Sequence, residues 1–165
     1  MNEQTQKDNE HARIFMEYLR MMRKRVTPER FMVLDSVYLC PRHFTADDVA
    51  AKLADTKCHI ALATVYGTLQ LMVEAGILTT LALPCQPLRY ELAASTHMHL
   101  VCTCCGHIKD LRDRALMRAV SQKRYAAFTA ERCDVTVYGI CSTCRRQNKK
   151  NQITSTYNKL SIPTI

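Results

Sequence analysis

The chain contains no tryptophan, and only four of its 165 residues are glycine. This scarcity argues against a glycine-rich loop of the kind that binds nucleotide phosphates. No apolar run approaches the roughly 18 residues of a membrane-spanning helix, so no membrane span is expected. The polar start of the chain, Met1 to Asp8, has no apolar core of a signal peptide. The sequence therefore predicts a cytoplasmic protein.

Positive charge exceeds negative charge, because 23 Lys and Arg residues oppose 15 Asp and Glu residues, for a net charge of +8. The excess is uneven: residues 1–84 hold ten of each sign, whereas residues 85–165 hold thirteen basic and five acidic residues. A basic chain favours a polyanionic partner such as nucleic acid. A solvated surface with a basic tail explains the same composition equally well.

Nine cysteines include two Cys-x-x-Cys pairs, Cys102 with Cys105 and Cys141 with Cys144, separated by 35 residues. Four thiolates in two closely spaced pairs match the tetrahedral coordination of a structural zinc site. In a cytoplasmic chain such cysteines indicate metal ligands before disulfides. Two alternatives are a set of buried, unligated thiols and a redox switch in which a pair cycles to a disulfide.

Capping signals mark helix boundaries in the first half of the chain. Thr27 can cap a helix that begins at Pro28, since proline suits the first helical position. Thr45 and Asp48 resemble a capping box, in which an acid follows shortly after the cap. Gly76 is a suitable end for a helix because glycine adopts the left-handed conformation without strain.

The order of the expected elements is that of a winged helix-turn-helix. Apolar residues at helical spacing predict helices over residues 11–23 and 62–75, with two short helices between them. Strands over residues 77–83 and 88–92 would form a hairpin, the wing. In such a fold one helix enters the major groove of DNA while the wing contacts the backbone.

The second half of the chain predicts a small α+β domain. Its strands are expected over residues 97–103, 108–111 and 133–139, with a helix over residues 115–128.

Several motifs occur together, in one order, within residues 20–144. They are Arg25-Val26-Thr27, Ala63-Thr64-Val65-Tyr66, Glu74-Ala75-Gly76, His97-Met98-His99-Leu100-Val101-Cys102 and the two Cys-x-x-Cys pairs. In this combination the chain resembles the ferric uptake regulator family of metal-responsive bacterial transcription factors. The resemblance implies a homodimer that binds palindromic operators in double-stranded DNA.

With this resemblance the expected fold class is α+β, with an N-terminal winged helix-turn-helix domain followed by a small α+β dimerisation domain. The expected divisions are a disordered start (1–9), the winged helix (10–87), a hinge (88–93), the metal-binding dimerisation domain (94–146) and a basic, disordered tail (147–165).

The resemblance also implies a second, regulatory metal site. Its ligands would be His43, Glu91, His97, His99 and Asp110. His97 and His99 lie two apart, so on a strand both face the same side, although one His-x-His motif is weak evidence alone. Imidazoles and carboxylates suit Fe(II), Mn(II) or Zn(II). Such an ion would close the two domains, set the paired reading helices at the half-site spacing and act as a corepressor.

Departures from the family pattern bear on what is sensed. The ligands of a further sensing site in many members correspond here to Thr96, Met98, Met117 and Cys133, so this further site is expected to be absent. One cysteine site with one sensing site resembles the peroxide-sensing branch, which acts through iron-catalysed oxidation of a His ligand. Those sensors carry Asp where this chain has Glu91, which favours a metal sensor. Iron, peroxide and zinc sensing all stay open.

By the same resemblance, the expected DNA contacts are Arg25, Ala63, Thr64 and Tyr66. An aromatic ring such as that of Tyr66 can pack on a thymine methyl group, and a basic side chain is favoured in the minor groove. A half-buried aromatic is the alternative for Tyr66. The family carries Arg after this Tyr, whereas this chain has Gly67, so a charged contact is lost.

Two other classes of function fit parts of the sequence. A His-rich site with an open position could be a catalytic zinc or iron centre, but no His-Glu-x-x-His motif occurs and the ligand set leaves little room for a substrate. The second is a protein-interaction module that is held together by zinc and whose winged helix binds another protein. Gly67 and the zero net charge of residues 1–84 are compatible with it. The leading hypothesis is a metal-dependent repressor of metal-homeostasis or oxidative-stress genes, with no enzyme activity.

Overall fold

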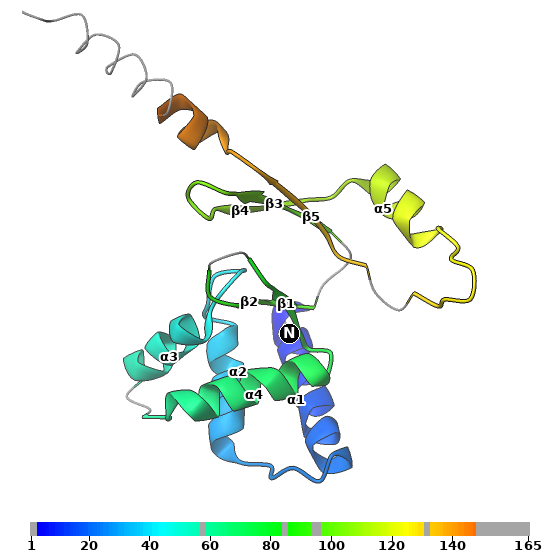
Figure 1. Cartoon of the computed structure of the whole chain (residues 1–165). Helices are drawn as coiled ribbons and strands as arrows, with labels where there is room; N and C mark the ends of the chain where they lie inside the picture. The colour runs from blue at the N-terminus through cyan, green and yellow to red at the C-terminus, as the bar shows by residue number, and fades with distance from the viewer. Residues whose placement is uncertain (1–2, 57–58, 84–85, 94–96, 131–132, 148–165) are drawn as a thin grey trace, which may run out of the picture. The chain divides into compact units, whose positions relative to one another are not determined.

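The computed structural model describes residues 3–56, 59–83, 86–93, 97–130 and 133–147 (Figure 1). The chain divides into two compact units, Met1–Ala94 (unit 1) and Ser95–Ile165 (unit 2). Strand β2 (Arg89–Leu92) belongs to unit 1, so the segment expected as a hinge, residues 88–93, contains part of the wing. Residues 142–147 are helical, and the rest of the expected tail, residues 148–165, lies outside the described residues.

Unit 1 is built on four helices, and α4 runs across the first two (Figure 1). They are α1 (Glu3–Met21), α2 (Pro28–Val37), α3 (Ala46–Asp55) and α4 (Leu62–Glu74). The expected disorder over residues 1–9 does not hold from Glu3 onward, because α1, anchored by the buried Phe15 and Leu19, extends back to Glu3. Glu, Gln and Lys are good helix formers, so a polar composition is compatible with this extension.

The capping signals are realised unequally. At α3 the Thr45 hydroxyl accepts a hydrogen bond from the backbone N–H of Asp48 at 3.2 Å, and the Asp48 carboxylate accepts one from the backbone N–H of Thr45 at 2.8 Å. At α2, Thr27 occupies the N-cap position in an extended conformation, but its side chain makes no capping bond. A backbone hydrogen bond and a bond from Thr27 lower the pKa of Glu29 instead. Gly76, with φ of 73°, follows the end of α4 as expected.

The wing is extended by a short bridge to the segment before α3. β1 (Leu78–Leu81) pairs antiparallel with β2. The backbone N–H of Phe44 donates to the Tyr90 carbonyl at 3.0 Å, and the N–H of Tyr90 donates to the Phe44 carbonyl at 2.7 Å. This antiparallel bridge brings His43 beside Glu91.

One hydrophobic core joins the helices of unit 1 to the wing. Its members are apolar side chains with at most 3% exposure: Phe15, Leu19, Val33, Leu34, Val37, Phe44, Ala46, Val49, Leu53, Val65, Leu69, Met72, Ile77, Leu78 and Tyr90. Truncating a buried Leu to Ala in such a core costs about 2–5 kcal/mol. Because Val65 and Leu69 anchor α4 in this core, the position of its exposed face is well defined.

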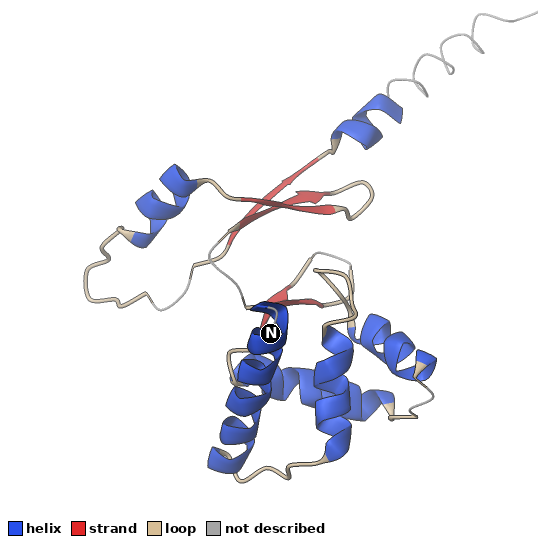
Figure 2. Ribbon diagram, turned by 180° about the vertical axis from the view of Figure 1, so that it is seen from behind, coloured by secondary structure: helices blue, strands red, loops and turns tan. Residues whose placement is uncertain are grey.

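Unit 2 contains a three-stranded sheet, in the order β4-β3-β5 (Figure 2). Its strands are β3 (Met98–Cys102), β4 (Ile108–Leu111) and β5 (Val135–Gly139). β3 pairs antiparallel with β4 and parallel with β5, and the parallel pair needs a crossover, which contains α5 (Arg114–Ser121). α5 is shorter than expected, and none of its residues is buried, so packing against the described residues of the unit does not extend it.

Candidate metal centres

The four paired cysteines meet at one end of the sheet in unit 2. β3 and β5 run parallel, with Cys102 opposite Gly139, so their C-terminal ends lie at the same edge. Cys102 ends β3 and Cys105 lies in the following turn, while Cys141 and Cys144 come directly after β5. The parallel pairing therefore brings together two cysteine pairs that are distant in sequence.

The geometry of this cluster fits a zinc ion. The four sulfur atoms all lie within 4.8 Å of one another. The sulfurs of Cys105 and Cys141 are 3.9 Å apart, close to the roughly 3.8 Å edge of a tetrahedron with Zn–S bonds of about 2.3 Å. The backbone N–H groups of Cys141 and Cys144 donate to the sulfurs of Cys102 and Cys141, at 3.3 and 3.4 Å. Hydrogen bonds of this kind orient metal ligands.

The sulfur of Cys102 is prepared to carry negative charge. The hydrogen bond from the backbone N–H of Cys141 is the main cause that lowers the pKa of Cys102 to about 6. The hydrogen bond with the Cys141 thiol raises the pKa of Cys144, so negative charge in this cluster is concentrated on Cys102. The thiolate is the form that binds metal.

The remaining described cysteines differ from these four. Cys104 and Cys133 are exposed free thiols. Cys40 is partly buried, its thiol donates to the Ser36 carbonyl at 3.3 Å, and burial raises its pKa to about 11. Cys40 therefore acts as a small, partly buried side chain and belongs to neither cluster of metal-capable residues. Cys58 and Cys85 lie outside the described residues.

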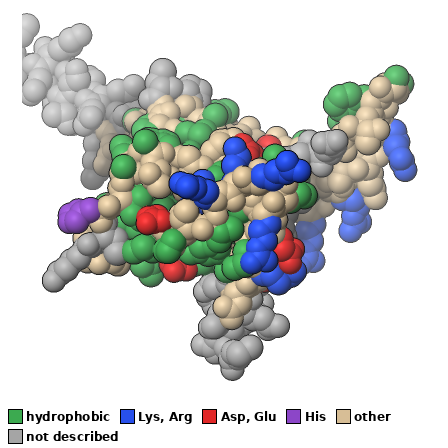
Figure 3. Space-filling model, turned by 90° about the horizontal axis from the view of Figure 1, so that it is seen from below, with side chains coloured by type: hydrophobic (Ala, Val, Ile, Leu, Met, Phe, Trp, Pro, Cys, Tyr) green, Lys and Arg blue, Asp and Glu red, His purple; other side chains and the backbone are tan. Residues whose placement is uncertain are grey.

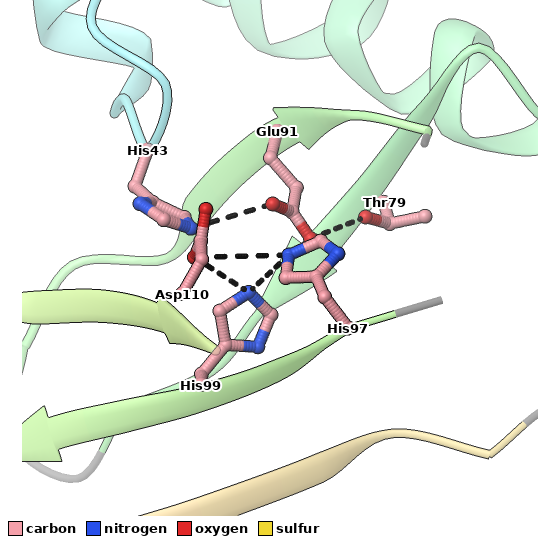
Figure 4. Close-up of polar contacts among 6 residues, drawn as sticks. All are labelled: His43, Thr79, Glu91, His97, His99 and Asp110. Carbon is pink, nitrogen blue, oxygen red and sulfur yellow. Dashed lines mark hydrogen bonds and ion pairs between the residues drawn. The ribbon is translucent and has the colours of Figure 1, made fainter. Parts of the chain in front are cut away.

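Three further metal-capable side chains converge in unit 2 (Figure 4). His97 directly precedes β3, and His99 lies opposite Asp110 in the pairing of β3 with β4. The Nε2 atoms of His97 and His99 are 3.0 Å apart, and Oδ1 of Asp110 is 3.7 Å from each. Two ligand atoms bound at right angles, each about 2.1 Å from an ion, lie roughly 3.0 Å apart. The Nε2 atoms of His97 and His99 and Oδ1 of Asp110 could therefore occupy three neighbouring positions around one metal ion.

A pair of metal-capable side chains also lies in unit 1. Nε2 of His43 is 3.3 Å from Oε2 of Glu91, and the two side chains are 11% and 8% exposed. Thr79 lies opposite Glu91 in the hairpin and donates to its Oε1 at 3.2 Å (Figure 4). Sequence reasoning missed Thr79, because its contact with Glu91 depends on the register of β1 and β2. Pairing the residues of the two expected strands outward from the turn could have placed Thr79 opposite Glu91.

The donor atoms of these two groups indicate the class of ion. Both groups offer imidazole nitrogen and carboxylate oxygen, a set that suits divalent iron, manganese or zinc rather than a soft ion. Glu91, His97 and His99 are all less than 10% exposed, so their orientation is held by packing. The chemistry of these side chains therefore fits the regulatory ion that the family resemblance implies.

The residues expected to contact DNA are all exposed on unit 1. Ala63 and Thr64 lie in the first turn of α4, and Tyr66 is 46% exposed. A Cβ added at Gly67 would meet no atom within 4 Å, so this face of α4 is open. Arg25 is exposed, and its carbonyl accepts a hydrogen bond from the Arg30 side chain. On the face shown in Figure 3, Lys and Arg side chains form patches separated by hydrophobic and acidic side chains.

Comparison with known proteins decides the family. A sequence profile of the ferric uptake regulator family matches residues 22–138. The chain belongs to the ferric uptake regulator family. The ferric uptake regulation protein of Campylobacter upsaliensis is 29% identical over 141 residues, which cover 82% of this chain and 89% of the relative. The peroxide operon regulator of Bacillus subtilis (strain 168) is 27% identical over 133 residues, which cover 80% and 92%.

Solved structures agree with this assignment. The ferric uptake regulator of Pseudomonas aeruginosa, solved with manganese, aligns with a TM-score of 0.66 at 26% identity, over 75% of this chain and 95% of that chain. The predicted α+β fold, with a helical DNA-binding part before a dimerisation part, is thereby confirmed. None of the described helices combines the length and apolar character that a membrane span requires.

Membership of the ferric uptake regulator family settles the class of function. The chain is a metal-binding transcriptional repressor, and its relatives are regulators rather than enzymes. Members of this family bind DNA and function as dimers. The catalytic alternative considered from the sequence is therefore wrong.

Proposed function

We propose that this regulator closes its two units around one regulatory ion, Fe(II), Mn(II) or Zn(II), while zinc occupies the four-cysteine site. The observation that carries the proposal is the division of the ligands. His43 and Glu91 belong to unit 1, whereas His97, His99 and Asp110 belong to unit 2. An ion bound by both groups would hold the two units in one orientation.

The proposed switch works by differential binding. With the units apart, an ion would meet the three proposed ligands of unit 2 alone, and with the units together it would meet all five proposed ligands. An ion shifts such an equilibrium only by the ratio of its affinities for the two forms. Moving the population from 1:99 to 99:1 requires a ratio of about 10⁴, or roughly 5.5 kcal/mol.

The active form would be a homodimer on a palindromic operator. Two copies of α4 would enter successive major grooves, about 34–36 Å apart, with Tyr66 toward base edges and Arg25 toward the minor groove. Unit 2 offers a surface for the second copy. Among its described residues, seven large apolar side chains are exposed: Leu111, Leu116, Tyr125, Phe128, Val137, Tyr138 and Ile140. β5 is an edge strand of the described sheet, and edge strands pair readily with another chain.

Histidine variants test the proposal with a matched control. His99→Ala should abolish metal-dependent binding to an operator selected from a random duplex pool, measured by fluorescence anisotropy with Mn(II) under low oxygen. Its zinc content, dimeric mass and unfolding temperature should stay at the wild-type values. His107→Ala, at an exposed histidine outside both groups, should behave as wild type. Metal-dependent operator binding by His99→Ala at the wild-type ion concentration would contradict the proposal.

Peroxide sensing through iron-catalysed oxidation of a His ligand is a second candidate. The similarity to the peroxide operon regulator of Bacillus subtilis favours it, whereas the glutamate at position 91 favours a metal sensor. Mass spectrometry of the iron-loaded protein after peroxide treatment separates the two. A gain of one oxygen atom on a peptide with His97 or His99, together with release of DNA, would support peroxide sensing. Unmodified peptides and retained DNA would support metal sensing.

A further inference from the structure

The positive charge of this regulator resides in unit 2, not in the unit that carries the reading helix. Residues 1–94 hold eleven basic and eleven acidic residues, whereas residues 95–165 hold twelve basic and four acidic residues. Helix α4 contains neither Lys nor Arg. The sequence-independent part of DNA affinity comes largely from neutralisation of phosphates by such side chains. Helix α4 carries one acid, Glu74, and no basic residue, so this contribution must come from basic side chains outside α4. In unit 1 these include the exposed Arg23, Lys24 and Arg25, and unit 2 carries the net positive charge.

The described basic residues of unit 2 concentrate around α5. Five exposed basic residues occur within residues 112–124, which we call the α5 segment: Arg112, Arg114, Arg118, Lys123 and Arg124. The one acid of the segment, Asp113, is the N-cap of α5, where its carboxylate accepts a hydrogen bond from the backbone N–H of Leu116 at 2.9 Å. No ion pair joins any of the five basic side chains to an acid among the described residues.

The geometry of α5 separates charge from apolar surface. Arg114 and Arg118 lie four apart and therefore on one face of the helix. At about 100° per residue, Leu116 and Val120 lie on the opposite face. Two like charges at this spacing destabilise an isolated helix, and a polyanion bound between them removes the repulsion. The apolar face stays available to the second subunit while the basic face points the other way.

We propose that the α5 segment is a second DNA-contact surface, which binds the phosphate backbone of duplex DNA outside the half-site read by α4. The proposal rests on the proposed function as a DNA-binding homodimer and adds a contact that α4 does not make. Four of the five basic residues are arginine, whose planar guanidinium binds phosphate in a bidentate manner. Phosphate contacts position a protein without reading sequence. The segment should therefore raise affinity equally for operator and for other DNA.

Charge-neutral variants test this surface. Arg114→Gln/Arg118→Gln removes two charges from the basic face of α5, and Arg145→Gln/Arg146→Gln removes two exposed charges from the same unit, outside the segment. Affinity of the metal-loaded, full-length protein is measured by anisotropy on a mixed-sequence duplex of about 40 base pairs, or roughly four helical turns. Salt is varied from about 50 to 200 mM.

In the α5 variant, the DNA affinity should depend less steeply on salt concentration than in the wild type. Each lost phosphate contact lowers the slope of log Kd against log salt by about 0.9. The homodimer of the α5 variant lacks two basic side chains in each of its two chains, so its slope should fall by up to roughly 3.6. Over that fourfold range of salt, the wild-type affinity should fall up to about 150-fold more than that of the α5 variant. Zinc content and the dependence of DNA binding on metal should be unchanged in both variants, and the control variant should keep the wild-type slope.

The other outcomes separate this inference from the proposed function. An unchanged slope in the α5 variant, or an equal loss in the control, overturns the inference while the proposed function stands. Absence of metal-dependent DNA binding in the wild type contradicts the proposed function itself. If the α5 variant keeps its DNA slope but loses binding to vesicles of anionic lipid, the surface serves a membrane and the inference is overturned.

Discussion

Thr79→Val should weaken the proposed regulatory site without removing any of its proposed ligands. The Thr79 hydroxyl donates to Oε1 of Glu91 at 3.2 Å from the opposing position on β1. Glu91 is 6% exposed, so few other groups can replace this bond. Valine has nearly the same shape as threonine and is favoured in strands. The substitution therefore removes the hydroxyl that orients the carboxylate and leaves the hairpin in place.

The size of the effect follows from the role of Thr79. Loss of a partner that orients a metal ligand typically lowers metal affinity about 10–100-fold, which corresponds to roughly 1.4–2.7 kcal/mol. A competition titration of Mn(II) against a fluorescent chelator measures this change. Thr80→Val is the matched control, because Thr80 is adjacent on β1 but lies opposite Tyr90 instead of Glu91.

Two results would refute the reasoning. Wild-type metal affinity in Thr79→Val would show that Glu91 is not a ligand held by this hydroxyl. An equal loss in Thr79→Val and Thr80→Val would trace the effect to β1 as a whole. The unfolding temperature of each metal-free variant shows whether the hairpin itself has changed.

Three further predictions concern the scaffold. Gly67→Ala should raise the free energy of unfolding in urea by about 1 kcal/mol, because the added Cβ enters open space in a helix; a loss of stability would contradict that environment. Thr68→Val should also raise it by about 1 kcal/mol, since this hydroxyl is buried without a hydrogen-bond partner among the described residues. A lowered urea midpoint for Thr68→Val would count against this. Cys141→Ser should lose the zinc and the dimer, whereas Cys104→Ser, at an exposed thiol, should keep both in elemental analysis and light scattering; a stable zinc-free dimer would argue against the structural site.

Features set by residues close in sequence could be predicted from the sequence. The capping box of Thr45 and Asp48 forms as expected because both partners lie within one helical turn. Gly76 has the expected positive φ after α4. The two cysteine pairs were recognisable by their spacing, since each pair closes within a single turn.

Features that depend on distant segments needed the structure. The bridge between Phe44 and Tyr90, which brings His43 beside Glu91, joins two segments that no spacing rule connects. The regulatory ligand set was accordingly expected from family resemblance, not from the pattern alone. Thr27 illustrates competition between local partners, because its side chain bonds Glu29 rather than capping α2.

The length of α5 depends on its surroundings. Its apolar spacing predicts a helix over residues 115–128, but α5 ends at Ser121 and buries no side chain. Helical spacing identifies a face that needs a partner, and the described residues of unit 2 do not bury this face. Tertiary packing, which supplies most helical stability in proteins, therefore does not extend this helix.

The most direct test of the two-site account is the metal content per chain of anaerobically purified protein, before and after mild chelation. The account predicts one zinc ion that resists the chelator and one exchangeable ion, with DNA binding lost and regained as the second ion is removed and restored. A single zinc with no exchangeable partner, even after addition of Fe(II), Mn(II) or Zn(II), would contradict it. His43, Glu91, His97, His99 and Asp110 would then be structural residues of a zinc-stapled regulator that senses no metal.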